Sequence, residues 1–303
     1  MDIESFSIAC QEQRKDYDYE FYDGFLLALG EPGLDWKVLK RFFLYDFDQE
    51  LAAEESSFAY CPLCLYCDVC LIKFPYWRKA WRHFGYAYCV RHRVLLRPFS
   101  SRNSVFKSWV AFSESCEAVG RQLESAPLGA PRAAVSIRDR LAFRTQNWLQ
   151  GKQRTRGAEA ICRVVRLLMS SFLCVRTDSR AGGYARFLFS PNSQQSIVHR
   201  RIEFEACLRM GVSTATPVER ASALLLVGLI FGLFNQSEIQ AIKTYAGRRG
   251  YLFPLSAKEI GRFMPIFISR NEKDQFVNEL QSMSHSLSEP LKVAVSDLVF
   301  SLK

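Results

Sequence analysis

The chain has 303 residues, of which 49% are hydrophobic and 14% aromatic, so it has enough apolar surface for two or three packed units and is not a disordered chain. Its ten cysteines are not arranged as the disulfide framework of a small secreted domain. The best candidate for a membrane span, 221–234, is too short to cross a bilayer and predicts a buried core helix. The opening residues are polar and acidic, unlike a signal peptide, so we expect a cytoplasmic protein.

Helical stretches separated by Gly- and Pro-rich breaks fill the first half of the chain. Gly30 and the following Glu-Pro-Gly give a clear stop signal, and Ser136 with Asp139 has the spacing of a capping box. A linker rich in Ala, Pro and Gly is expected at 125–131. Helices are expected over 21–29, 36–47, 104–123, 136–149 and 158–175.

The second half predicts a loop followed by short helices. Residues 177–196 are predicted to form a loop with a short hairpin at 184–189. Thr216, Pro217 and Glu219 form a strong helix start, and Asn235 with Glu238 has the spacing of another cap. Short helices joined by tight turns are compatible with a helix-turn-helix, for which Asn235–Arg249 is one candidate, with an ordinary helical bundle as the alternative. Further helices are expected over 216–234 and 235–247, and from 256 onward.

These elements predict a mainly α fold, with a small cysteine-containing module inserted in a multi-helix protein that has a helix-turn-helix-like C-terminal bundle. The expected units are an acidic helical segment, the small module, a basic helical region and a C-terminal helical domain. Their boundaries are 1–57, 58–100, 101–215 and 216–303.

Two close-spaced pairs of soft ligands occur within a window of 32 residues. Cys61 and Cys64 form a Cys-x-x-Cys pair, and Cys89 and His92 a Cys-x-x-His pair after an insert of 24 residues. Three thiolates and one imidazole suit a tetrahedral Zn²⁺ site, and four protein ligands leave no position open for catalysis. The cofactor expected is therefore structural Zn²⁺, bound by Cys61, Cys64, Cys89 and His92, so the small module at 58–100 is predicted to be a zinc-finger module.

Neighbouring residues leave alternatives open at this site. Cys67 and Cys70 extend the run of thiols at a spacing of three, so an iron–sulfur cluster is a second possibility. The usual ferredoxin run has a longer last gap and a following proline, and neither occurs here. Cys67 and Cys70 are otherwise small apolar residues or stand-in ligands, and His83 is a competing ligand.

Charge is sharply segregated along the chain. Residues 1–57 hold 14 acidic and 5 basic side chains, whereas residues 69–113 hold 9 basic side chains and no acidic one. A second basic stretch, 132–166, holds 9 basic side chains against Asp139 and Glu159. Such a distribution favours contact with the phosphate backbone of double-stranded DNA, although a solvated face is the simpler reading of any single charge run. The residues that we expect most to contact DNA are Arg78, Lys79, Arg82, Arg91 and Arg93.

The amino-acid sequence of the module is more specific than a generic zinc-binding motif. It contains Tyr60 to Cys64, then Pro75 to Arg78, then Trp81 with Arg82, and finally Cys89 to His92 followed by the apolar 94–96. Over residues 58–99 this pattern resembles the TniQ family of transposition target-selection proteins, and residues 20–27 faintly resemble the family's opening helix. The resemblance implies that the two pairs are zinc ligands. It also implies a non-enzymatic adaptor that recognises a target, through DNA or an RNA-guided complex, and recruits a transposition AAA+ ATPase. Such an adaptor is expected to be bacterial and associated with the nucleoid.

Signatures of enzymes are missing from the sequence. It contains no phosphate-binding GxxxxGK[ST] loop, no GxGxxG, no HExxH and no GxSxG, so we expect no catalysis. The acidic segment 1–57 is expected to dock the ATPase or another basic partner, and a homodimer is a further expectation because the chain holds segments of opposite charge. The alternatives are a protein–protein scaffold with a purely structural zinc site and a transcriptional regulator using the C-terminal helices.

Overall fold

The computed structural model describes residues 59–99, 107–125, 136–153, 158–190, 197–199, 201–264 and 266–302. Within this part of the chain the fold is mainly helical, with a single sheet of two short strands. This confirms the predicted fold class. The helices expected at 21–29 and 36–47, and all of the linker at 125–131 except its first residue, lie outside the described residues.

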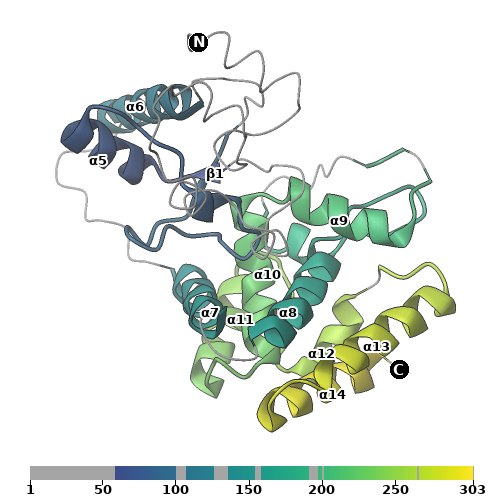
Figure 1. Cartoon of the computed structure of the whole chain (residues 1–303). Helices are drawn as coiled ribbons and strands as arrows, with labels where there is room; N and C mark the ends of the chain where they lie inside the picture. Colours follow the sequence, from purple (N-terminus) through teal and green to yellow (C-terminus); the bar gives the residue numbers. More distant parts are fainter. Residues whose placement is uncertain are drawn as a thin grey trace, which may run out of the picture.

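The segment with the two ligand pairs forms a small unit beside a long helix. Strand β1 (Ala59–Tyr60) pairs antiparallel with β2 (Arg97–Pro98), so the two ends of the segment lie together. Helix α5 (Pro62–Ile72) begins with a proline at its first position and ends where Lys73 adopts a left-handed conformation, with φ of 61°. A 3₁₀ turn, Lys79–Arg82, follows. Helix α6 (Lys107–Ser125), expected at 104–123, packs on α5 (Figure 1).

The rest of the described chain is a helical body built around one buried helix. Helix α10 (Pro217–Ile230) is buried at every position except Val218 and lies between α7 and α8. Helices α13 and α14 pack together beside α12, at the opposite end of the molecule from α5 and α6 (Figure 1). The other helices of the body are α7 (Ile137–Gln153), α8 (Ala158–Leu173), α9 (Phe204–Thr214), α11 (Gln236–Gly247), α12 (Ala257–Ile260), α13 (Arg270–Ser284) and α14 (Glu289–Leu302).

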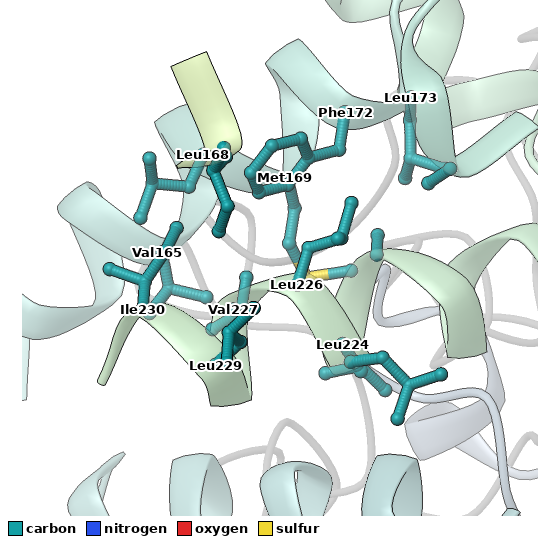
Figure 2. Packing of buried hydrophobic residues seen from close by; sticks show 14 of the residues in the cluster. Val165, Leu168, Met169, Phe172, Leu173, Leu224, Leu226, Val227, Leu229 and Ile230 are labelled. Atoms are coloured by element: carbon teal, nitrogen blue, oxygen red, sulfur yellow. The ribbon is translucent and has the colours of Figure 1, made fainter. Parts of the chain in front are cut away.

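The interface between α8 and α10 forms the centre of the main core. Leu168 and Phe172 of α8 point toward Leu226 and Ile230 of α10, and their neighbours fill the space between the two helices (Figure 2). Each large apolar side chain that is fully buried stabilises the fold by about 1.5–3 kcal/mol relative to leaving it in water. Within the described residues no helix is long and apolar enough to span a membrane.

Three of the predicted helix starts are confirmed by their hydrogen bonds. Thr216 and Glu219 form a reciprocal capping box, and so do Asn235 and Glu238. Ser136 Oγ accepts a hydrogen bond of 3.1 Å from the backbone N–H of Asp139. Helix α10 ends at Ile230, before the predicted end at 234, because Gly232 turns the chain with a φ of 64°.

One expectation for the loops was wrong. No hairpin occurs at 184–189; the chain makes a 3₁₀ turn, Tyr184–Arg186, that continues as a turn to Phe189. Ser222 on α10 donates a hydrogen bond of 2.8 Å to the carbonyl of Leu188, so this segment packs on a helix and not on another strand. The helix start expected at Ser256 is present: Ser256 is the N-cap of α12, Ala257–Ile260, although its side chain makes no capping hydrogen bond.

Candidate metal centre

The four predicted ligands lie together. The ligand atoms of Cys61, Cys64, Cys89 and His92 are all within 4.8 Å of one another, and the three cysteines are buried. His92 Nδ1 is 3.4 Å from the sulfur of Cys61, 3.3 Å from that of Cys64 and 3.6 Å from that of Cys89. The sulfurs of Cys64 and Cys89 are 3.6 Å apart.

These separations match the edges of a tetrahedral zinc site. With Zn–S bonds of about 2.3 Å and a Zn–N bond of about 2.0–2.1 Å, a regular tetrahedron has S–S edges of about 3.8 Å and S–N edges of about 3.6 Å. The S–N distances of 3.3 to 3.6 Å and the S–S distance of 3.6 Å are equal to these edges or slightly shorter. The site therefore fits a small tetrahedral ion that accepts sulfur and nitrogen, with Nδ1 of His92 as the ligand atom.

Local backbone structure places each pair of ligands. Cys61 is the N-cap of α5 and Cys64 lies in its first turn, so the start of one helix presents both sulfurs. Cys89 and His92 lie on a tight turn, in which the N–H of Arg93 donates to the carbonyl of Cys89 (2.7 Å) and that of Cys89 to the carbonyl of Val94 (2.8 Å). Arg93 adopts a left-handed conformation with φ of 55°, which reverses the chain after His92.

The neighbouring thiols do not belong to the ligand cluster. Cys67 is one turn further along α5, and its sulfur lies 3.8 Å from Nε2 of His92, on the far side of the imidazole ring. Cys70 is exposed, and His83 is absent from the cluster. The run of four thiols therefore does not converge on one point, as an iron–sulfur cluster would require. The sulfur of Cys67 lies where it can accept a hydrogen bond from Nε2–H of His92 while Nδ1 faces the ligands, a contact that would orient the imidazole.

The three ligand thiols are joined by hydrogen bonds whose protons a bound metal would replace. The thiol of Cys64 interacts with Cys61 and Cys89, and these hydrogen bonds and burial raise its pKa above the ordinary value of 9.0. The sulfur of Cys89 accepts hydrogen bonds from Cys61 and Cys64, which lower its pKa well below that value. One thiolate held by two thiol donors is the arrangement from which Zn²⁺ would displace protons.

The helical body supports the turn that presents Cys89. The side chain of Gln146, buried on α7, accepts hydrogen bonds of 2.9 Å from the N–H groups of Ala87 and Tyr88 and donates one of 2.8 Å to the carbonyl of Tyr88. The hydroxyl of Tyr88 donates to Asp139 at 2.8 Å. Phe84 and Tyr88 belong to the main core, whereas Trp77 and Trp81 pack around the ligands. The metal centre is thus continuous with the body of the protein.

The residues expected at DNA fall into different environments. Arg78 forms a two-pronged ion pair with the buried Asp68, at 2.7 and 2.8 Å, and its guanidinium lies 4.2 Å from the ring centre of Tyr76. Arg91 lies between the last two ligands and Arg93 directly follows His92; both are exposed, and no carboxylate of the described residues pairs with them. The side chains of Lys79 and Arg82 lie outside the described part of the chain.

The sequence reasoning missed three residues that shape this site. Asp68 lies one position before the carboxylate-free stretch that we counted, and it neutralises Arg78. Cys67 was considered only as a ligand or filler, although it contacts His92. Gln146 had a usable signal, because it shares the inner face of α7 with Leu141, Ala142, Thr145 and Leu149, which are all buried. A glutamine on such a face needs polar partners in the core.

Comparison with known proteins adds no relative to these observations. No family model, curated protein or solved structure matches the chain.

Proposed function

We propose that this chain is a non-enzymatic, zinc-stabilised adaptor of the TniQ type that binds double-stranded DNA. The observation that supports it best is the turn at 89–93, which presents two exposed arginines beside a tetrahedral ligand set. The stretch from 69 to 113 contains no carboxylate that would repel a phosphate backbone. With Arg78 paired to Asp68, the DNA contact is assigned first to Arg91 and Arg93, and Arg78 holds the module together.

The metal has a structural role in this proposal. Four protein ligands complete a tetrahedral shell, so the ion has no free position for a water or substrate. Its ligands join the start of α5 to the turn at 89–92, two segments that β1 and β2 also bring together. Zinc would thereby fix the orientation of the turn that presents Arg91 and Arg93.

The adaptor role also requires a protein partner. The resemblance implies recruitment of a transposition AAA+ ATPase to a selected target. Helix α5 is apolar on its outer side as well, where Leu63, Tyr66, Leu71 and Ile72 are exposed. A helix with apolar residues on all sides is normally covered, and this outer side is the surface that we assign to protein contact. The acidic segment 1–57, also proposed to dock a partner, lies outside the described residues.

The DNA contact is tested by removing the two exposed charges without disturbing the turn. The variant carries Arg91→Ala and Arg93→Asn, because asparagine tolerates the left-handed conformation at position 93. With about 0.9 lost per phosphate contact, the slope of log K against log salt should fall in magnitude by about 1.8. A control with Lys258→Ala and Arg270→Ala removes two charges from exposed sites on α12 and α13. Equal effects of the two variants would refute the assignment.

A protein–protein scaffold is the second candidate, and the exposed outer side of α5 favours it. In that case the zinc site would only staple the fold, and duplex DNA would bind weakly with no dependence on Arg91 or Arg93. Loss of partner binding on Leu71→Lys, with DNA affinity absent in the parent chain, would favour the scaffold over the adaptor.

A further inference from the structure

Helix α11 is a rigidly held helix with one face turned to solvent. Its inner face is anchored by Ile239, Ile242 and Ala246, which are buried in the main core. Its start is fixed by the capping box of Asn235 and Glu238, and the tight turn after α10 leads directly into it. A helix held in this way presents its outer side chains in a fixed geometry.

The one carboxylate of α11, that of Glu238, is neutralised by an ion pair. Glu238 accepts two hydrogen bonds from Arg144 of α7, at 2.6 and 2.8 Å, and Arg144 also donates to the carbonyl of Leu233. The exposed outer face consequently has no unpaired negative charge. It is made of short, amide-bearing and basic residues: Gln236, Ser237, Gln240, Ala241, Lys243, Thr244, Gly247 and Arg248.

This composition matches the chemistry of base edges in the major groove. The glutamine side chain pairs with the N6 and N7 groups of adenine, and lysine or arginine pairs with O6 and N7 of guanine. Ser237, Ala241, Thr244 and Gly247 are short, so the helix can approach the groove closely. The 12-residue helix is about 18 Å long, and a major groove about 12 Å wide accepts a helix. A merely solvated face would be expected to mix both charge signs.

We propose that α11 enters the major groove of duplex DNA and reads bases through Gln236, Gln240 and Lys243. Basic residues at its borders would contact the phosphates on either side of the groove. Arg140 is exposed on α7, the helix to which Arg144 ties α11, and Arg248 and Arg249 follow the other end of α11. The guanidinium of Arg249 lies 3.8 Å from the ring centre of Tyr245, which holds it beside the helix.

The outer face of α11 goes beyond the proposed function. The turn that carries Arg91 and Arg93, called here the zinc turn, offers only positive charge and therefore cannot distinguish one DNA sequence from another. The two surfaces divide the work between general affinity and sequence preference. Because they lie on different elements, variants of one leave the other intact.

The test is selection of bound sequences from a pool of randomised DNA duplexes, using the full zinc-loaded chain. The parent chain is expected to enrich a defined sequence. The variant Gln236→Ala with Gln240→Ala should lose preference at one or more positions by roughly tenfold, at little cost in affinity for unselected DNA. The matched control, Gln275→Ala with Asn278→Ala, alters two exposed amides on α13 and should retain the parent sequence.

Three results would overturn the inference: no enrichment by the parent chain, the same enriched sequence from the glutamine variant, or equal affinity for duplex RNA of the enriched sequence. The zinc-turn variant Arg91→Ala with Arg93→Asn separates this inference from the proposed function. If that variant binds unselected DNA like the parent while the α11 variant loses its preference, the zinc-turn assignment fails and the α11 assignment stands. All these side chains are exposed, and unchanged circular dichroism confirms that the variants fold.

Discussion

Gln146 provides the most direct way to test how the helical body supports the metal centre. Its buried amide satisfies three backbone groups of Ala87 and Tyr88, immediately before the ligand Cys89. The variant Gln146→Leu keeps a similar size but offers no hydrogen bond. Each buried backbone group left without a partner costs about 1–3 kcal/mol, so three such groups cost at least about 3 kcal/mol. That is a large part of the roughly 5–15 kcal/mol that stabilises a typical domain.

Urea unfolding of the zinc-loaded chain measures this loss, and competition with a chelator measures the accompanying loss of zinc affinity. Gln150, one turn further along α7, provides the matched control, because its buried Nε2 makes no hydrogen bond within the described residues. Gln150→Leu should therefore leave the free energy of unfolding unchanged or slightly increased. If Gln146→Leu and Gln150→Leu unfold within about 0.5 kcal/mol of each other, the reasoning is refuted.

Three further predictions concern the ligand shell, the core and acid stability. Cys67→Ala should weaken zinc binding roughly tenfold, because it removes the sulfur behind Nε2 of His92; unchanged affinity in a chelator competition would contradict this. Gly228→Ala should cost roughly 1–3 kcal/mol in urea unfolding, since the new Cβ would lie 2.2 Å from Thr145 Oγ1 and 2.4 Å from Phe234 Cζ; a neutral result would show that the core yields. Arg180 holds the pKa of Glu272 below its ordinary 4.5, so this pair's stabilisation is complete above pH 4.5 and is lost as the pH falls through the lowered pKa. Glu272→Gln should flatten the loss of stability in that acid range, and an unchanged pH profile would count against the pair.

The elements that the sequence predicted well depend on neighbours close in the chain. Thr216 with Glu219 and Asn235 with Glu238 form the capping boxes expected from a spacing of three residues. The Cys61–Cys64 pair likewise depends on one helical turn. The contact between this pair and the Cys89–His92 pair, 25 residues away, was predictable because two close-spaced pairs of Cys and His are typical of a zinc site.

The elements that the sequence did not predict depend on contacts between distant residues. The segment 184–189 has a composition compatible with a hairpin, yet the contact of Leu188 with Ser222 on α10 decides its structure. The contacts of Gln146 with Ala87 and Tyr88 span nearly 60 residues. From the sequence, Arg78 was predicted to be a free charge, because its partner Asp68 comes next to it only through the fold of α5. Local propensity contains no information on such pairs.

The measurement that tests the central claim most directly is the metal content of the purified chain, determined by elemental mass spectrometry beside two cysteine variants. Cys89→Ser removes a buried ligand, and Cys70→Ser alters an exposed thiol of the same segment that lies outside the cluster. The account predicts about one zinc per chain in the parent and in Cys70→Ser, and its loss in Cys89→Ser. Iron in place of zinc, or a well-folded parent chain without metal, would contradict it.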